Sequence, residues 1–216
     1  MITDLKAESY IESLIKYNSD LCEDIREEAV NSDVPIIRRS TESFLKFILE
    51  MKKPKNILEV GTAVAYSTIL MAENTASDTF ITTIEKFKPR ILLAKENIKR
   101  AALNKRINLL EGDAASILKR LVLENKKFDF IFMDAAKAQY INWLPDILKL
   151  MECNALLLSD NVLQDGDVAG SKYALVRRNR SIYSRMRKYL YEITHNDLLS
   201  SAILPVGDGI ALSMRR

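Results

Sequence analysis

After Pro54, short apolar runs alternate with amphipathic stretches, and this alternation constrains the fold more than any other feature of the chain. Five runs have the length and composition of buried strands, and they cover residues 56–60, 79–84, 107–110, 128–133 and 155–158. Apolar residues at helical spacing separate consecutive runs. Strands that alternate with helices form a parallel sheet with helices on both faces, and ligands bind at the carboxyl ends of its strands. The sequence therefore predicts an α/β fold.

The segments that flank this alternation complete the predicted domain. Residues 1–53 carry apolar side chains at helical spacing, which predicts a helical N-terminal extension to a core over residues 54–216. Residues 198–204 and 210–214 have the pattern of two strands around the glycine-rich turn at 205–209, and we expect this antiparallel pair to close the sheet. The chain has 216 residues, of which 48% are hydrophobic and 28% charged, and this suits one globular domain.

Composition excludes several protein classes. No apolar run is long enough to cross a bilayer, and residues 1–8 carry Asp4 and Glu8 in place of a basic and then apolar leader. Cys22 and Cys153 lie far apart without CxxC spacing, so we expect neither a disulfide framework nor a zinc site, and we predict that both thiols are buried. We expect a cytoplasmic protein with no membrane partner.

The turn after the first strand favours a cofactor without a phosphate. Gly61 follows the strand, but Ala63 and Tyr66 stand where a dinucleotide-binding GxGxxG motif has its other glycines. S-adenosylmethionine carries an adenosine but no phosphate, so the missing glycines favour methyl transfer over hydride transfer. Glu85 ends the second strand, where a carboxylate accepts hydrogen bonds from both ribose hydroxyls, and Asp113 follows the third, at an edge suited to adenine. The alternative interpretation of each residue taken singly is a turn glycine for Gly61, a surface acid for Glu85 and a helix cap for Asp113.

Hard oxygen ligands and a lysine follow the fourth and fifth strands. Asp134 comes directly after one strand, and Asp160 and Asn161 after the other. Oxygen-only ligands favour Mg²⁺, with Mn²⁺ or Ca²⁺ in its place, over zinc or copper. A substrate with two neighbouring oxygens can chelate such a cation, and Lys137 can accept the hydroxyl proton if its own pKa falls beside the dication. Helix capping and a solvated lysine are the alternatives.

A set of short motifs at these strand ends carries a family resemblance. They are Glu59-Val60-Gly61-Thr62, Tyr66-Ser67, Glu85, Glu111-Gly112-Asp113-Ala114, Asp134-Ala135-Ala136-Lys137, Tyr140, Ser159-Asp160-Asn161-Val162-Leu163 and Gly207-Asp208-Gly209. Over about residues 30–216, the chain resembles the cation-dependent O-methyltransferases related to catechol and caffeoyl-coenzyme A O-methyltransferases. The resemblance implies a Rossmann-like class I methyltransferase fold with a mostly parallel seven-stranded sheet, and it implies S-adenosylmethionine and Mg²⁺ as cofactors.

The resemblance also implies a role for individual residues. Metal ligands are implied at Asp134, Asp160 and Asn161, and catalytic roles for Lys137 and Asp134. Cofactor contacts are implied at Ile37, Glu59, Gly61, Ser67, Glu85, Asp113, Ala114 and Asp134. The chain departs from the family at Ala65, where relatives usually carry glycine, and at Ile37, where methionine is common.

The positive charge of the chain is concentrated after the fifth strand, since residues 172–188 hold seven basic side chains and no acidic one. Within the family, residues 176–182 are similar to those of the bacterial tRNA 5-hydroxyuridine methyltransferases, which implies tRNA as a partner. The expected phosphate contacts are Arg177, Arg178, Arg180, Arg185, Arg187 and Lys188, and the expected stacking residues are Tyr173, Tyr183 or Tyr189. The alternative is a solvated helix face with its tyrosines in the core.

Three functional hypotheses follow. The first is a magnesium-dependent methyltransferase that converts 5-hydroxyuridine of the tRNA anticodon loop to 5-methoxyuridine. The second is an O-methyltransferase of small catechol-like phenols, and the third a nucleic-acid-binding module without catalytic activity. His195, the only histidine, has no identifiable nucleophile beside it and is predicted to be structural or superficial. The amphipathic N-terminal helices, with Tyr10, Leu14 and Tyr17 on one face, can pack on the domain or on a second subunit, and we expect a homodimer.

Overall fold

The computed structural model describes residues 5–170 and 180–216. Its strands are β1 (Asn56–Val60), β2 (Phe80–Glu85), β3 (Ile107–Glu111), β4 (Phe128–Met133), β5 (Met151–Ser159), β6 (Leu199–Leu204) and β7 (Ile210–Arg215). The α-helices are α1 (Leu5–Ser13), α2 (Asp20–Asn31), α3 (Arg39–Lys52), α4 (Tyr66–Glu73), α5 (Lys88–Arg100), α6 (Ala114–Leu123), α7 (Tyr140–Leu150) and α8 (Arg180–His195). Two short 3-10 helices, η1 (Lys137–Gln139) and η2 (Gln164–Gly166), follow β4 and β5.

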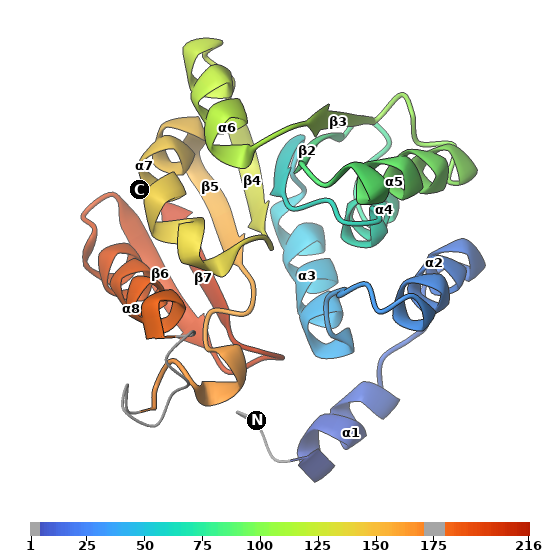
Figure 1. Cartoon of the computed structure of the whole chain (residues 1–216), viewed down its shortest axis with the longest axis horizontal. Helices are drawn as coiled ribbons and strands as arrows, with labels where there is room; N and C mark the ends of the chain where they lie inside the picture. Colours follow the sequence, from blue (N-terminus) through green and yellow to red (C-terminus); the bar gives the residue numbers. More distant parts are fainter. Residues whose placement is uncertain (1–4, 171–179) are drawn as a thin grey trace.

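The strands form one seven-stranded sheet in the order β3-β2-β1-β4-β5-β7-β6 (Figure 1). Neighbours from β3 to β5 are parallel, whereas β7 runs antiparallel to both β5 and β6. The predicted fold class is confirmed, including the antiparallel pair at the C-terminus. The chain passes from β1 outward to β3 and then returns to β4 beside β1, so the strand order reverses between β1 and β4. In such sheets the crevice at this crossover binds the ligand.

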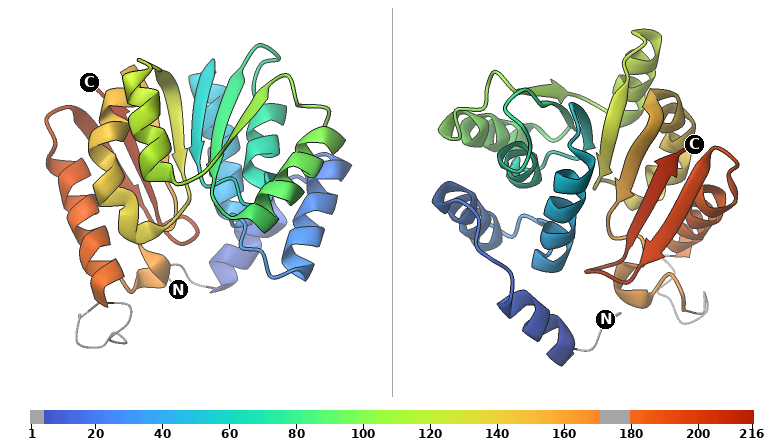
Figure 2. Two further views of the ribbon diagram at one scale, coloured as in Figure 1. Left: turned by 45° about the horizontal axis from the view of Figure 1, so that its top comes forward. Right: turned by 180° about the vertical axis from the view of Figure 1, so that it is seen from behind.

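Alternate residues of each central strand face two helical layers. On β1, Ile57 packs in a cluster with residues of α3, α4 and α5, and Leu58 packs in a second cluster with residues of α6, α7 and α8. Figure 2 shows the two layers on opposite faces of the sheet. The side chains of Ile57 and Leu58 are completely buried. This burial on both faces explains why the strands are continuous apolar runs rather than alternating ones.

One predicted strand boundary and one predicted burial were wrong. β5 begins at Met151, four residues before the apolar run at 155. The sequence did not indicate this start because the first part of the strand carries the polar side chains of Glu152 and Asn154. Cys153 lies on this exposed part of the strand, whereas Cys22 is buried in α2 as expected.

The N-terminal helices form as predicted, although they differ in how they pack. α3 buries Leu45, Ile48 and Leu49 against the core, whereas Tyr10 and Leu14, in and just after α1, are more than half exposed. The division of the chain into an extension and a core stays a prediction. Among the described residues, no helix has both the length and the apolar character needed to span a membrane.

Candidate active site

A cavity of about 950 Å³ lies at the carboxyl ends of the parallel strands. This volume suits a ligand the size of a nucleoside-containing cofactor. Most of the predicted site residues line it, namely Ile37, Gly61, Ser67, Glu85, Asp113, Ala114, Asp134, Lys137, Asp160 and Asn161. The parallel strands bring these positions together because all of them end at the same edge of the sheet.

Glu59 is the predicted cofactor residue that does not line the cavity. Its carboxylate is completely buried, and it accepts hydrogen bonds from Ser67 Oγ at 2.5 Å, Thr83 Oγ1 at 2.6 Å and the Thr68 hydroxyl. Burial raises the pKa of Glu59 to about 7, although the three hydroxyl donors favour the charged form. The structure therefore places Glu59 beneath the cofactor turn, where it orients Ser67.

Gly61 is required by the backbone of the neighbouring strand. Its φ angle is +108°, and a Cβ atom here would lie 2.0 Å from the Asp134 carbonyl oxygen. A side chain is excluded at that distance. The predicted tight turn is present, and the reason for its glycine is the close packing of the β1 turn against the end of β4. Ala65, which replaces the usual glycine of the family, has a left-handed φ of +68° and caps α4.

Glu85 at the end of β2 already accepts three backbone hydrogen bonds. Its Oε2 accepts from Ala63 N at 2.9 Å, and its Oε1 accepts from Lys86 N and Phe87 N, both at 2.9 Å. A carboxylate has about four acceptor sites, so these contacts fix its orientation and leave few sites for ribose hydroxyls. Glu85 is 8% exposed and is therefore no solvated surface acid.

Asp113 combines two of the roles considered from the sequence. Its Oδ1 accepts from Ala115 N at 3.0 Å and Ser116 N at 3.4 Å, which makes it the N-cap of α6. It also lines the cavity beside Ala114. The helix cap holds Asp113 in place at this edge.

Tyr140 joins the ends of β4 and β5, after which the predicted metal ligands Asp134, Asp160 and Asn161 follow. Its buried hydroxyl donates to the Met133 carbonyl at 2.9 Å and lies 3.3 Å from the Asp160 carbonyl. It also accepts from Ala135 N at 3.2 Å. The two strand ends that carry the predicted ligands are thereby held at a fixed spacing.

The predicted metal ligands converge at one end of the cavity. Asp160 is 1% exposed, and its Oδ2 has no hydrogen-bond partner among the described residues. Asn161 donates from Nδ2 to Asp208 Oδ2 at 3.1 Å, which leaves its amide oxygen available to a ligand. Burial and then the charge of Asp134 raise the pKa of Asp160 above its ordinary value. The described residues contain no cluster of three His, Cys, Asp or Glu side chains arranged for a metal, so an amide oxygen has to complete the set.

Lys137 lies in η1 and points at the same cluster. Its Nζ donates to Asp134 Oδ1 at 2.5 Å and lies 3.3 Å from the Tyr140 hydroxyl. Burial disfavours the ammonium, but Tyr140, Asp134 and Asp160 more than offset this effect, and the pKa of Lys137 lies above its usual range. Without a cation the direction is thus opposite to the one expected beside a dication, because the negative charges of Asp134 and Asp160 favour the ammonium of Lys137.

Several cavity residues were missed by the sequence analysis. They include Arg38, Phe87, Arg90, Gln139, Trp143 and Asp208. Asp208 stood in a motif that carried the resemblance, but no role was assigned to it. Its Oδ1 pairs with Arg38 Nη2 at 2.6 Å, and Arg38 Nη1 lies 3.3 Å from Glu8 Oε1. This chain of ion pairs joins three distant segments at the end of the cavity that holds the predicted metal ligands, which we call the metal end.

The basic segment is only partly described, because Tyr173, Arg177 and Arg178 lie outside the described residues. The predicted stacking is wrong for two tyrosines: Tyr183 and Tyr189 are buried, and their hydroxyls bond to Asp167 and Ser159. Both point inward because α8 packs its apolar face on the sheet.

The basic side chains of α8 differ in their surroundings. Arg187 donates to the carbonyls of Val168 and Gly170, so it fixes residues 168–170 against α8. Arg180, Arg185 and Lys188 are exposed. His195 at the end of α8 is also exposed and stacks on Tyr191 at 3.9 Å between ring centroids, which confirms it as a surface residue.

A parallel sheet with an acidic residue ending β2 and a cofactor-sized cavity at its crossover defines a class of enzymes that bind an adenosine-containing cofactor. Comparison with known proteins defines the family. The model of the O-methyltransferase family matches residues 12–216. The chain therefore belongs to the O-methyltransferase family, and it is an S-adenosylmethionine-dependent O-methyltransferase of the cation-dependent type.

Individual relatives agree with this assignment. The catechol O-methyltransferase of Niastella koreensis is 34% identical over 162 residues, which cover 74% of this chain and 73% of that protein. The caffeoyl-CoA O-methyltransferase of Citrus natsudaidai is 30% identical over 198 residues, which cover 89% and 85%. The structure of a Bacillus cereus O-methyltransferase in complex with S-adenosylhomocysteine has a TM-score of 0.87 at 25% identity and covers 100% of both chains.

Proposed function

We propose that this enzyme transfers a methyl group from S-adenosylmethionine to a hydroxyl that has an oxygen neighbour, with Mg²⁺ as its metal. The observation that carries the proposal is the convergence of Asp134, Lys137, Asp160 and Asn161 at one end of the cofactor cavity. S-adenosylmethionine carries its methyl group on a sulfonium sulfur. This methyl group can be transferred directly to an ionised oxygen.

The donor set suits a divalent cation. A buried carboxylate oxygen without a partner, Asp160 Oδ2, is costly unless a cation compensates it. The charge of Asp134 raises the cost of ionising Asp160, and the Asn161 oxygen adds a neutral ligand. Two carboxylates and an amide form a hard oxygen set of the kind that Mg²⁺ prefers. Such a cation, when bound, lowers the pKa of a coordinated hydroxyl and orients an oxygen pair.

Lys137 is the residue that moves the proton. Its Nζ is hydrogen-bonded to Asp134, and the residue lines the cavity. A general base has to lie within hydrogen-bond distance of the proton that it accepts, and this position allows it for a substrate bound in the cavity. The hydrogen bond with the Tyr140 hydroxyl restricts the orientation of the Lys137 side chain. In the Mg²⁺-loaded enzyme, Lys137 accepts the hydroxyl proton at Nζ, and the nearby carboxylates stabilise the ammonium that forms.

For the substrate we propose 5-hydroxyuridine in the tRNA anticodon loop, because its 5-hydroxyl stands beside the 4-carbonyl. Support comes from Arg180, Arg185 and Lys188, which are exposed on α8 and belong to residues 172–188, a segment whose sequence has no acidic residue. α8 starts after η2, close to the edge where β5 ends, so its first residues are on the cavity side of the sheet (Figure 1). A tRNA substrate also agrees with the expected cytoplasmic location.

A small catechol-like phenol is the alternative substrate, and one observation favours it. Two of the similar proteins are a catechol and a caffeoyl-CoA O-methyltransferase. The cavity chemistry suits either substrate, since both present two adjacent oxygens.

Nucleoside mass spectrometry of tRNA from a strain without the gene tests the choice. We expect 5-hydroxyuridine to accumulate and 5-methoxyuridine to vanish, and the purified enzyme with Mg²⁺ to restore it. Activity should disappear with EDTA and return with Mg²⁺. Methylation of catechol by the purified enzyme, with 5-methoxyuridine unchanged in the strain, would support the alternative.

The triple variant Arg180→Ala, Arg185→Ala and Lys188→Ala tests the basic surface. We expect tRNA binding to weaken and its salt dependence to become shallower, because phosphate contacts release counterions. The matched control replaces Lys119, Lys126 and Lys127, which are exposed near the opposite edge of the sheet. Equal tRNA binding by both triple variants would count against the RNA surface.

The homodimer remains a proposal. Its support is an apolar surface on α1 and α3 that includes Ile11, Phe47 and Met51, each at least half exposed. Light scattering after size exclusion measures the mass, and a Phe47→Lys variant should shift a dimer towards the monomer. A monomeric wild-type protein would overturn the proposal.

A further inference from the structure

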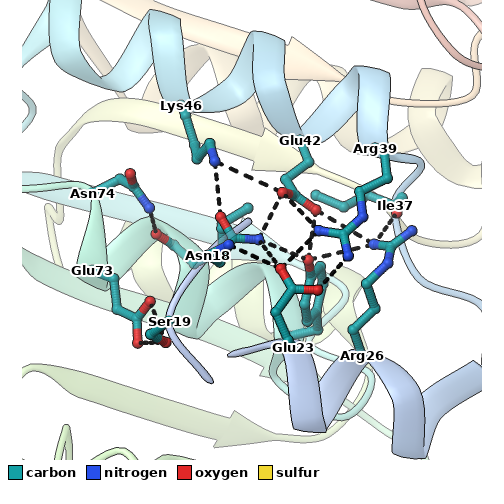
Figure 3. Close-up of polar contacts among 12 residues, drawn as sticks. Asn18, Ser19, Glu23, Arg26, Ile37, Arg39, Glu42, Lys46, Glu73 and Asn74 are labelled. Carbon is teal, nitrogen blue, oxygen red and sulfur yellow. Dashed lines mark hydrogen bonds and ion pairs between the residues drawn. The ribbon is translucent and has the colours of Figure 1, made fainter. Parts of the chain in front are cut away.

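A completely buried carboxylate lies outside the cavity, between the N-terminal helices and the core. Glu42 of α3 has 0% exposure, and a charge in such a place has to be paired. Figure 3 shows the side chains that surround it. Its partners are Tyr66 Oη at 2.6 Å, Asn18 Nδ2 at 2.7 Å, Arg26 Nη1 at 3.4 Å, Arg39 Nη1 at 3.4 Å and Lys46 Nζ at 3.9 Å.

Two residues that are hydrogen-bonded to Glu42 or Arg26 also line the cofactor cavity and form two of its walls. Tyr66 is the first residue of α4, whose N-terminus follows the Gly61 turn, and Ile37 lies in the segment between α2 and α3. Arg26 Nη1 donates to the Ile37 carbonyl at 3.3 Å and lies 3.4 Å from Tyr66 Oη. The guanidinium is also 5.5 Å from the centre of the Tyr66 ring. One arginine and one carboxylate therefore hold both walls.

Packing alone does not explain the ion pair between the completely buried Glu42 and Arg26, whose side chain is 18% exposed. Apolar side chains of similar volume often replace such pairs without loss of stability. Hydrogen bonds, by contrast, fix distance and direction. Neither Arg26 nor Glu42 lines the cavity, so an effect of either residue on the cofactor has to pass through Tyr66 and Ile37.

We propose that Arg26 and Glu42 are positioning residues for S-adenosylmethionine. They set the spacing between the segment at residues 35–38 and the N-terminus of α4, and the affinity for the cofactor depends on this spacing. The N-terminal helices thereby belong to the cofactor site, although they lie outside the sheet. The inference requires only the cofactor of the family, and it is independent of the metal and of the methyl acceptor.

Binding of S-adenosylhomocysteine to the metal-free protein, measured by titration calorimetry, tests the proposal. We expect Glu42→Gln and Arg26→Met to raise the Kd about tenfold, and Tyr66→Phe, which removes only a hydroxyl, to raise it about threefold. In turnover assays, KM for S-adenosylmethionine should rise by similar factors while kcat changes by less than twofold. Arg26→Lys, which keeps the charge but not the two-sided contact, should restore only part of the affinity.

The matched control is Ser19→Ala. Ser19 caps the same helix α2 and bonds to Glu73 at the far end of α4, so its loss weakens the same interface away from the cavity. We expect a lower melting temperature and an unchanged Kd. Wild-type Kd values in folded Arg26→Met and Tyr66→Phe variants would overturn the proposal, and so would an equal rise in Kd for Ser19→Ala. If Glu42→Gln does not fold, the Kd values of Arg26→Met and Tyr66→Phe decide the question.

Discussion

The two ends of the cavity use polar groups in opposite ways. At the cofactor end, Glu59 and Glu85 each accept three hydrogen bonds from the protein itself. At the other end, Asp160 keeps one buried oxygen without a partner, and Asp134 and Lys137 stand beside it. The cofactor end is thus organised before any ligand arrives, whereas the metal end concentrates charge that a ligand has to compensate. Substitutions at the two ends should therefore separate binding from chemistry.

The largest effect is expected at the metal end, from Lys137→Ala. Turnover should fall by about 10²- to 10⁴-fold, because general base catalysis contributes roughly that much. The Kd for S-adenosylhomocysteine should stay the same, since the cofactor end keeps its contacts. The control is Lys149→Ala, a lysine of α7 whose side chain is 61% exposed. Unchanged turnover in the Lys137 variant would remove its assigned role and with it the contrast between the ends.

Gly61→Ala tests the point where the two ends touch. The added Cβ would overlap the Asp134 carbonyl, so we expect a loss of more than about 3 kcal/mol in the free energy of unfolding, measured with urea. Gly166→Ala is the control, because Gly166 also has a positive φ of +93° but nothing lies within 4 Å of its added Cβ. Its backbone strain alone should cost about 1–2 kcal/mol. Equal losses in both variants would show that the contact with Asp134 is unimportant.

Glu59→Gln should change how stability depends on pH. The pKa of Glu59 is about 7 in the folded protein and 4.5 as its ordinary value, so the folded state holds its proton more tightly. This group therefore stabilises the fold most below pH 4.5, and its contribution declines as pH rises through 7, by a few kcal/mol at about 1.4 kcal/mol per pKa unit.

Urea unfolding of both proteins at pH 5 and pH 8 measures this effect. Glutamine does not titrate, so the wild type should lose more stability than the variant between the two pH values. The exposed Glu50→Gln variant should follow the wild type. Parallel losses in the wild type and the Glu59 variant would contradict the raised pKa and the picture of a preorganised cofactor end.

The smallest effect is expected from Asp208→Ala. Asp208 holds the Asn161 amide so that its oxygen is available, and residues of this kind around a metal site affect affinity by about tenfold or more. We expect about tenfold weaker Mn²⁺ binding, measured by electron paramagnetic resonance, with unchanged cofactor binding. Asp197→Ala, an exposed carboxylate before β6, is the control. Unaltered Mn²⁺ affinity would show that Asn161 is oriented by something else.

The chain sequence predicted the parts of this molecule that depend on local pattern. The strands of the parallel sheet coincide with the apolar runs, and the turn at Gly61 and the predicted metal ligands after β4 and β5 follow the ends of these runs. The strand ends could be placed on one edge because parallel strands share their direction. The start of β5 was missed, since Glu152 and Asn154 interrupt the apolar pattern.

Contacts between distant segments could not be predicted in this way. Arg38 and Asp208 meet because α3 and the β6–β7 turn pack at the same end of the cavity. Tyr183 and Tyr189 looked like surface aromatics among basic residues, but the orientation of α8 turns them inward. Sequence spacing fixes the position of a residue on its own helix and leaves the partner of that helix face open.

By itself, the sequence determined the sheet, the class of cofactor and the residues that gather at the strand ends, because hydrophobic period and strand direction are local and repetitive. Only the tertiary structure decided why Gly61 is a glycine, why the pKa of Lys137 lies above its usual range in the metal-free protein and how Glu42 reaches the cofactor walls. These properties depend on burial and on distances between groups far apart in the chain, and both arise only when the layers pack.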